Sequence, residues 1–376
     1  MKVIIVGTAY PYRGGLAAFT ERLARQYQSE GHEVEVYTFS LQYPSFLFPG
    51  KTQYSSLPAP ENLVVLRKVN SCNPFNWLKV GNEIAKKKPD LVVFTYWMAF
   101  MAPCFGTIAR RIKKNHHTKV IALIHNMIPH EPTILDKLLP PYFVKSMDGF
   151  VALSKMVMED INKFDKKGKP NTFCPHPIYD NYGAHISRSD ALNNLGLSPD
   201  CEYVLFFGFI RAYKGLDLLL EAFADKRIAN LNVKLIVAGE FYVDSEPYMQ
   251  QIRDLGIEDK VVLKTNFIPD NEVYNYFCAS NLVVQPYKSA TQSGVTQIAF
   301  NFEKPMLVTK VGALGDIVPN GKVGYVVEPQ SVEIANAIVD YFENHREPEF
   351  TANTIEEKKK YEWANMTKSI NEMMNK

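Results

Sequence analysis

The chain alternates short runs of apolar, often β-branched residues with longer segments in which apolar positions recur every three or four residues. Runs such as 91–94 (Leu-Val-Val-Phe) are apolar without interruption, which is typical of parallel strands covered on both faces. In the first half, the predicted strands are 3–6, 34–38, 64–66, 91–95, 120–124 and 149–152, and the predicted helices are 17–28, 77–85, 105–113 and 156–162.

The second half repeats this alternation, with turn residues between the elements. Its predicted strands are 203–207, 234–237, 261–263, 282–284, 306–308 and 325–327, and its predicted helices are 216–223, 248–255, 272–278, 295–302 and 332–342. Two successive series of strands and helices predict an α/β protein with two doubly wound, Rossmann-like domains. A length of 376 residues also favours two domains over one.

The segment 175–200 contains three prolines, two glycines and many polar residues, and it shows no clear period. We interpret it as the connection between the domains. The sequence therefore predicts a first domain over 1–180 and a second over 181–355. The last segment, 356–376, is predicted to form a separate polar helix.

The composition, with 46% hydrophobic and 22% charged residues, is that of a globular protein. No apolar run approaches the ~18 residues that a membrane-spanning helix needs, and the N-terminal apolar run is too short for a signal peptide. The five cysteines are scattered and form no C-x-x-C pair, so neither disulfides nor a zinc site is predicted. We expect a cytoplasmic protein.

The charge is distributed unevenly. Residues 1–180 carry 23 Lys and Arg against 14 Asp and Glu, a net +9, whereas residues 181–376 carry 19 against 26, a net −7. Basic clusters lie at 86–88, 110–114 and 163–169. They are either solvated ends of surface helices or a means of attracting the first domain to the anionic inner face of a membrane, at roughly 1 kcal/mol per basic side chain.

Three loops that follow predicted strands have the residue types of an anion site. The first contains Gly14 and Gly15 at the start of a helix, where backbone N–H groups can approach an anion. A plain tight turn is the alternative, since the G-x-G-x-x-G pattern of a dinucleotide site is absent.

The second loop, 207–217, contains Gly208, Arg211 and Lys214 between a strand and a helix. Ligands of open α/β sheets bind at the carboxyl ends of the strands, and two cations there suit the departing charge of a diphosphate. The alternative is a basic turn that pairs with Asp217.

The third loop is small and rich in hydroxyl groups, and it starts another helix. Its amides and hydroxyls are suited to phosphate or sugar hydroxyls. Its candidate donor-binding residues are Thr291, Gln292, Ser293, Gly294, Val295 and Gln297. A further candidate pair, His125 and Asn126, ends a strand of the first domain, where a histidine facing a ligand is suited to a functional role.

The order of these motifs resembles retaining glycosyltransferases of family four, over nearly the whole chain. The resemblance rests on Gly14-Gly15, His125-Asn126, Gly208-x-x-Arg211-x-x-Lys214-Gly215, Val237-Ala238-Gly239-Glu240, the block 286–327 and the tail Lys304-Pro305…Gly312…Asn320-Gly321…Gly324. It implies a GT-B fold, in which two Rossmann-like domains face each other across a cleft that holds the donor. It also implies a UDP- or GDP-sugar as co-substrate with no cofactor, no metal requirement, and retention of anomeric configuration.

By this resemblance, Arg211 and Lys214 hold the donor diphosphate and Gly15 contacts it from the other domain. Glu240 belongs to the donor-binding motifs, and His125 lies near the reacting sugar. The last helix of the family crosses back to the first domain, a role that 356–376 would fill.

One feature departs from the family pattern, which has two glutamates eight positions apart at the donor sugar and ribose. Counting back from Lys304, those positions are Ala290 and Ile298, and a shift of one residue brings in Gln297. Neutral groups bind hydroxyls more weakly than carboxylates, so the donor stays open. Two alternative functions stay open as well: a nucleotide-sugar 2-epimerase and a nucleotide-sugar-binding subunit without catalysis.

The acceptor side is defined by two apolar stretches, the loop 41–50 and the segment 96–101, which contains Tyr96 and Trp97. Together with Asn126, they are either ordinary core cover or part of a site for a glycan or lipid-linked acceptor at a membrane surface. We expect a role in cell-surface polysaccharide synthesis and no nucleic-acid partner.

Overall fold

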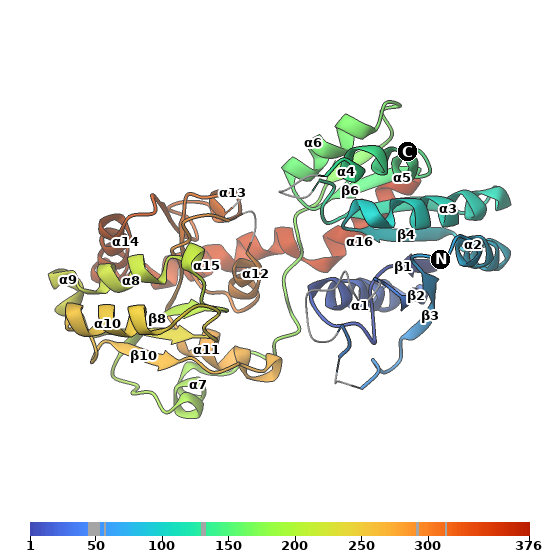
Figure 1. Cartoon of the computed structure of the whole chain (residues 1–376). Helices are drawn as coiled ribbons and strands as arrows, with labels where there is room; N and C mark the ends of the chain where they lie inside the picture. Colours follow the sequence, from blue (N-terminus) through green and yellow to red (C-terminus); the bar gives the residue numbers. More distant parts are fainter. Residues whose placement is uncertain (44–52, 56–57, 129–132, 291–292, 313) are drawn as a thin grey trace. The chain divides into compact units, whose positions relative to one another are not determined.

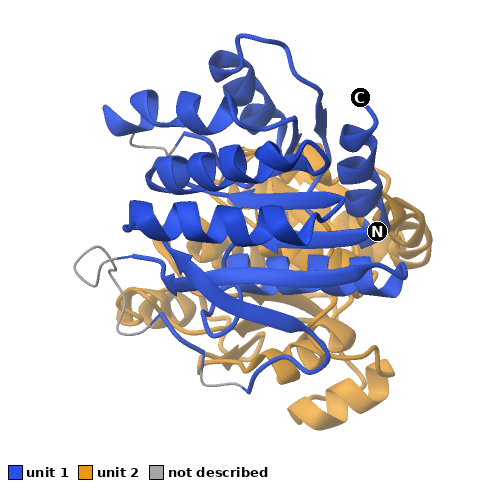
Figure 2. Cartoon of the chain, turned by 90° about the vertical axis from the view of Figure 1, so that its right-hand side faces the viewer, with its two compact units in different colours: residues 1–176, 362–376 blue, residues 177–361 orange. Residues whose placement is uncertain are grey.

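The computed structural model describes residues 1–43, 53–55, 58–128, 133–290, 293–312 and 314–376. They form two compact units, the first made of residues 1–176 and 362–376 and the second of residues 177–361 (Figure 2). Within the described residues, no helix is long and apolar enough to cross a membrane.

Unit 1 contains a seven-stranded parallel sheet in the order β3-β2-β1-β4-β5-β6-β7 (Figure 1). Its strands are β1 (Lys2–Val6), β2 (Glu33–Leu41), β3 (Val64–Asn70), β4 (Leu91–Tyr96), β5 (Lys119–Ile124), β6 (Gly149–Ala152) and β7 (Asn171–Phe173). Its helices are α1 (Gly15–Ser29), α2 (Pro74–Lys87), η2 (Ala99–Met101), α3 (Ala102–Ile112), η3 (Lys113–Asn115), α4 (Leu135–Leu138), α5 (Pro140–Val144), α6 (Lys155–Phe164) and α16 (Trp363–Met374).

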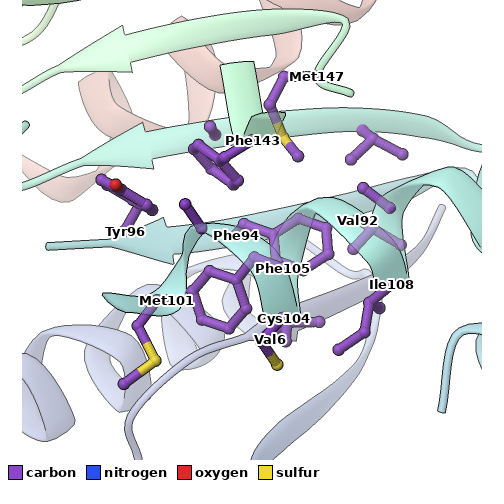
Figure 3. Packing of buried hydrophobic residues seen from close by; sticks show 14 of the residues in the cluster. Val6, Val92, Phe94, Tyr96, Met101, Cys104, Phe105, Ile108, Phe143 and Met147 are labelled. Carbon is purple, nitrogen blue, oxygen red and sulfur yellow. The ribbon is translucent and has the colours of Figure 1, made fainter. Parts of the chain in front are cut away.

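The core of unit 1 is rich in aromatic side chains. Phe105 of α3 packs on Phe94 of β4 with ring centroids 5.1 Å apart, and Tyr96 stacks on Phe143 of α5 at 4.4 Å (Figure 3). The C-terminal helix α16 packs against α1, β5 and β6. It is also tied to α1 by hydrogen bonds, one of them from the Thr367 hydroxyl to Glu30.

Unit 2 contains a six-stranded parallel sheet in the order β10-β9-β8-β11-β12-β13. Its strands are β8 (Glu202–Phe207), β9 (Val233–Ala238), β10 (Val261–Lys264), β11 (Leu282–Gln285), β12 (Met306–Thr309) and β13 (Gly324–Val327). Its helices are α7 (Arg188–Leu195), η4 (Ala212–Lys214), α8 (Leu216–Phe223), α9 (Lys226–Ala229), α10 (Glu246–Leu255), η5 (Asp270–Glu272), α11 (Val273–Ala279), α12 (Gly294–Asn301), α13 (Leu314–Ile317), α14 (Ser331–Glu343), α15 (Glu347–Lys358) and η6 (Lys359–Tyr361).

Both faces of the unit 2 sheet are buried. Tyr203 and Leu205 of β8 pack in a cluster with residues of α7, α11 and α12. Val204 and Phe206, which alternate with them, pack in a second cluster with residues of α8, α10 and α14. Since successive strand residues point to opposite faces, this double cover explains why the strands are apolar without interruption.

The predicted class, two doubly wound α/β domains, is confirmed. In both sheets the strand order reverses beside the first strand, between β1 and β4 in unit 1 and between β8 and β11 in unit 2. Ligands of such sheets bind outside the carboxyl ends of the strands at this switch point. In unit 2, the loops after β8 and β11 therefore lie where the ligands of such sheets bind.

Three sequence predictions need correction. The segment 175–200 was interpreted as the connection between the domains, and no helix was predicted in it, but it contains α7, which Ser187 caps and Gly196 ends in a left-handed conformation. Only two of its residues are buried, which explains the weak period. β7 was missed because it is short and polar. The polar helix predicted over 356–376 is two elements, because α15 ends at Lys358 and α16 begins at Trp363 with a buried apolar face.

Candidate functional site

The loops after β8 and β11 are joined in unit 2. The backbone N–H of Lys288 donates to the carbonyl of Tyr213 at 2.7 Å. Gly215, with φ +69°, lies so close to Pro286 that a Cβ there would come within 1.9 Å of the Pro286 carbonyl oxygen. Only glycine fits this position, so the helix α8 starts directly against the neighbouring loop.

A second close approach shapes the same edge of the sheet. Gly208 has φ +98°, and a Cβ there would lie 3.0 Å from the Lys214 ammonium nitrogen. Gly239, at the end of β9, has φ +135° and would place a Cβ 2.5 Å from the Gly208 carbonyl oxygen. Gly239 therefore allows the end of β9 to lie against the Gly208 backbone, and Gly208 leaves room for the Lys214 ammonium.

The ammonium of Lys214 is held without a counter-charge. Burial, and then the nearby charge of Arg211, lower the pKa of Lys214 to about 8. The nitrogen lies 5.6 Å from the centre of the Tyr287 ring. Within the described residues, no carboxylate pairs with it. A half-buried cation in this setting is stabilised when an anion binds beside it.

Arg211 is exposed on the same loop, and its guanidinium lies 5.2 Å from the centre of the Tyr242 ring. The structure shows no ion pair between Arg211 and any described carboxylate. Two neighbouring cations thus point at one edge of the sheet, each resting on an aromatic ring. The predicted role of these two cations at a diphosphate stays a prediction.

The alternative role of this loop, pairing with Asp217, does not apply to its two cations. Asp217 instead accepts from Lys288 at 2.5 Å, a surface pair that links α8 to the loop after β11. Lys288 pairs with this carboxylate, and the structure shows no ion pair between it and Lys214 or Arg211.

The loop before α12 contributes hydroxyl and amide groups. Ser293 caps α12 by accepting from the Val295 N–H at 3.3 Å, and its hydroxyl lies 3.3 Å from that of Tyr287. Gly294, the first residue of α12, is exposed. Thr291 and Gln292, which were also predicted to bind the donor, lie outside the described residues.

Tyr287 was missed by the sequence analysis, although it directly follows Pro286 in the third loop. It is buried, its ring faces the Lys214 ammonium, and its hydroxyl reaches Ser293. Burial raises its pKa to about 12, so the hydroxyl keeps its proton. One side chain therefore connects the cationic loop with the hydroxyl loop.

The two positions at which the family pattern has glutamates, 290 and 298, differ in burial. Ile298 is a buried core residue of α12, and Ala290 is half-buried. Gln297 is also buried, and its side-chain oxygen lacks a hydrogen-bond partner among the described residues. Buried polar atoms are almost always paired, so the unpaired Gln297 oxygen is an unusual feature of this helix, and the predicted role of Gln297 in donor binding stays a prediction.

Glu240 is exposed directly after β9, and its backbone carbonyl accepts from the Ile210 N–H at 2.8 Å. This bond attaches the end of β9 to the loop that carries Arg211. Its predicted role in donor binding stays a prediction.

In unit 1, Gly14 and Gly15 begin α1. Gly14 has φ +100° and is the residue before the helix, with no side-chain cap, and both glycines are exposed with open space where a Cβ would stand. The positive φ favours glycine at position 14, and the open space leaves the first N–H groups of a 15-residue helix accessible.

His125 follows β5, and its backbone N–H donates to the Tyr96 carbonyl at 2.8 Å. Its ring lies edge-on to Phe19, with centroids 4.6 Å apart, and its Nε2 is buried without a hydrogen-bond partner among the described residues. Burial, and then the neighbouring His176, lower its pKa to about 3. The imidazole is therefore neutral. Asn126 is half-buried beside it.

The two aromatic residues predicted for the acceptor side occupy different settings. Tyr96 is completely buried against Phe143, and its hydroxyl is buried without a hydrogen-bond partner among the described residues; its predicted acceptor contact stays a prediction. Sequence could not show this burial, because both residues follow the same apolar strand. Trp97 is half-buried and donates its indole N–H to the Tyr43 hydroxyl at 2.7 Å.

No group of three or more His, Cys, Asp or Glu side chains within the described ranges is arranged to hold a metal ion. The positive charge at the site of unit 2 comes from Arg211 and Lys214.

Two known families match the chain. Residues 13–178 match the family described as Glycosyltransferase Family 4. Residues 201–344 match the family described as Glycosyl transferases group 1. The second match contains every residue of unit 2 that the geometry above brings to the site.

Similar proteins cover most of the chain. An uncharacterised glycosyltransferase of Methanocaldococcus jannaschii is 23% identical over 96% of this chain and 95% of its own length. A lipopolysaccharide 1,2-N-acetylglucosaminetransferase of Salmonella typhimurium is 24% identical over 70% of this chain and 68% of its own length. The crystal structure of Anabaena HepE in complex with UDP aligns with 100% of this chain over 100% of its own chain. The TM-score of this alignment is 0.68, and the sequence identity is 16%. At that identity the likeness shows the fold, which is GT-B.

Proposed function

Since the chain belongs to the glycosyltransferases of family 4 and group 1, we propose that it transfers a sugar from a nucleoside-diphosphate sugar to a glycan or lipid-linked acceptor. The observation that carries this proposal is the cation pair of Arg211 and Lys214, which lies at the switch point of unit 2 without a carboxylate partner in the described residues. We further propose retention of configuration, which follows from the resemblance to family four.

The proposed chemistry requires charge stabilisation at the leaving group. When the bond between the sugar and the diphosphate breaks, negative charge grows on the phosphate oxygens, and fixed positive groups stabilise it. The guanidinium of Arg211 supplies five N–H donors in a rigid fork that can bind a phosphate bidentately, and the ammonium of Lys214 supplies a compact charge. Together they would serve the role that a bound metal ion plays in other transferases.

Similar structures bear on the base of the donor. The crystal structure of HepE contains UDP, which supports a uridine nucleotide here, with a guanosine nucleotide as the alternative. On the acceptor side, the Salmonella relative is a lipopolysaccharide sugar transferase, which supports a role in cell-surface polysaccharide synthesis.

A lipid-linked acceptor would be met at an anionic membrane surface, and the basic residues of unit 1 support this part of the proposal. Lys87 is paired with Glu35 and is not available. Lys86 and Lys88 are exposed at the end of α2, and Lys114 is exposed on η3, which packs against α2. We call these three lysines the α2 basic cluster.

Apolar groups for membrane contact are present on another element of unit 1. The loop 41–50 lies largely outside the described residues. In and next to α4, Ile134, Leu135 and Leu138 are 75%, 59% and 66% exposed. Exposed apolar side chains of this kind are typical of surfaces that meet lipid or another protein.

A panel of nucleotide-sugars tests the proposal. We expect one of them to raise the unfolding temperature by mass action and to release nucleoside diphosphate slowly without acceptor. Arg211→Ala should lower the rate about 30- to 1000-fold, equivalent to ~2–4 kcal/mol of transition-state stabilisation. The fold should persist because Arg211 is exposed.

Other outcomes favour other functions. Conversion of the nucleotide-sugar to its 2-epimer would favour an epimerase. Tight binding without any turnover would favour a binding subunit. Near-normal turnover by a folded Arg211→Ala variant would contradict the assignment of the site.

A further inference from the structure

Three aromatic side chains next to the cation pair are exposed: Tyr213, whose ring centroid lies 6.2 Å from that of Tyr287, and the pair Phe209 and Tyr242, which contact each other. Phe209 is 43% exposed and Tyr242 is 51% exposed. Their ring centroids lie 4.4 Å apart with an interplanar angle of 52°. They come from different loops, one after β8 and the other after β9.

Backbone hydrogen bonds set the positions of the two rings. Beyond the ends of the strands, the Ile210 N–H donates to the Glu240 carbonyl at 2.8 Å, and the Tyr242 N–H donates to the Ile210 carbonyl at 3.0 Å. Ile210 is completely buried, and Phe241 packs against the core. Because side chains of extended segments alternate, Phe209 and Tyr242 point to the opposite, solvent-exposed face.

The same alternation places Arg211 and Glu240 on that face. The Arg211 guanidinium lies 5.2 Å from the Tyr242 ring centre. The rings are therefore continuous with the cations proposed to hold the diphosphate. A donor bound there has two ends that extend from its diphosphate, the nucleoside and the sugar.

We propose that Phe209 and Tyr242 form an aromatic surface that stacks on the nucleobase of the donor. The inference rests on the proposed function, because it takes Arg211 and Lys214 as the diphosphate site. A nucleobase is flat and aromatic, and its stacking on exposed aromatic rings is favourable for every base.

The position in the sheet favours the base over the sugar as the occupant. The cation pair lies in the loop after β8. Phe209 and Tyr242 lie on its β9 side, whereas Ser293 and Gln297 lie on its β11 side. The polar residues suited to sugar hydroxyls thus lie on the side away from the aromatic rings. The nucleobase would therefore lie on the β9 side, against Phe209 and Tyr242.

Titration calorimetry with UDP, GDP and inorganic pyrophosphate tests the inference, because pyrophosphate has the diphosphate but no base. We expect the unaltered protein to bind both nucleotides more tightly than pyrophosphate. Phe209→Ala and Tyr242→Leu should each weaken nucleotide binding about 5- to 160-fold, the loss of one base–aromatic contact. Their affinity for pyrophosphate should stay unchanged.

Two further variants serve as controls. Tyr242→Phe keeps the ring and should keep the affinity. Phe75→Ala removes an aromatic side chain of α2 that is 84% exposed in unit 1, and it should leave all three affinities unchanged. Since Phe209 and Tyr242 are exposed, circular dichroism and unfolding temperatures should match those of the unaltered protein.

The remaining outcomes separate the possible failures. If Tyr242→Leu weakens pyrophosphate binding as much as nucleotide binding, and Phe209→Ala changes neither, Tyr242 acts only by positioning Arg211 and the base-stacking inference is wrong. If nucleotide binding is unchanged but binding of a nucleotide-sugar falls, the rings contact the sugar instead. If the unaltered protein binds neither nucleotides nor nucleotide-sugars, the proposed function itself fails.

Discussion

Replacing Lys214 by methionine is expected to stabilise unit 2 and to weaken its ligand binding. The pKa of Lys214 falls from 10.5 to about 8 through burial and the charge of Arg211. At 1.36 kcal/mol per pKa unit, this shift corresponds to roughly 3 kcal/mol against the protonated side chain. Because Lys214 keeps partial contact with solvent, Lys214→Met should raise the free energy of unfolding by about 1–3 kcal/mol at pH 7.

The stability difference should depend on pH. Below pH 8, Lys214 is protonated in both the folded and the unfolded chain, and its full cost is present. Between pH 8 and 10.5 the unfolded chain binds more protons than the folded one, so the stability of the unaltered protein rises with pH over this window. The advantage of Lys214→Met should therefore shrink as the pH rises from 8 towards 10.

Ligand binding should show the complementary dependence. An anionic diphosphate raises the pKa of Lys214, so above pH 8 binding requires the uptake of a proton and becomes weaker. Lys214→Arg keeps its charge throughout this range and should lose that dependence. Titration of the ligand itself changes the affinity of both proteins equally. The difference in pH dependence between the unaltered protein and Lys214→Arg therefore reports on Lys214 alone.

Urea unfolding at pH 7 to 10 gives the measurement. Because the two units are able to unfold separately, the transition to follow is the one that nucleoside diphosphate moves to higher urea. Lys288→Met is the matched control. Lys288 forms a surface pair with Asp217, so its loss should change stability by less than about 1 kcal/mol. Two outcomes would show that Lys214 has a counter-charge in the free protein. One is a lower free energy of unfolding for Lys214→Met than for the unaltered protein. The other is a difference between these two free energies that does not change with pH.

Three further predictions concern the metal, the histidine and the membrane. Activity should persist in EDTA, because Arg211 and Lys214 supply the charge at the diphosphate; complete loss restored by Mn²⁺ would contradict this. The ratio of the rates of the unaltered protein and His125→Asn should be constant from pH 5 to 8, since a pKa of about 3 keeps the imidazole neutral there; an inflection near pH 6.5 in the unaltered protein alone would contradict it. Replacing the three lysines of the α2 basic cluster by glutamine should reduce co-sedimentation with anionic liposomes, which should also weaken as salt shortens the Debye length from ~10 Å at 0.1 M to ~3 Å at 1 M, while donor hydrolysis stays intact. If the unaltered protein ignores such liposomes at low salt, a soluble acceptor is the better proposal.

The sequence by itself determined the strands except β7, the fold class and the place of the cationic loop. Uninterrupted apolar runs report strands that are buried on both faces, and this property is local enough to read from neighbouring residues. The motif around Arg211 and Lys214 follows such a strand, so its place at the carboxyl end of the sheet is a consequence of the same pattern. Elements with few buried residues, such as α7 and β7, left no comparable signal.

Only the tertiary structure decided what surrounds each functional group. Tyr96 and Trp97 are neighbours in sequence, yet Tyr96 is buried against Phe143 from α5 and Trp97 reaches Tyr43. The lowered pKa of Lys214 and the rings under the two cations depend on loops that are distant in the chain. Burial, charge and hydrogen-bond partners are set by such long-range contacts, and the spacing of residues along the chain does not contain them.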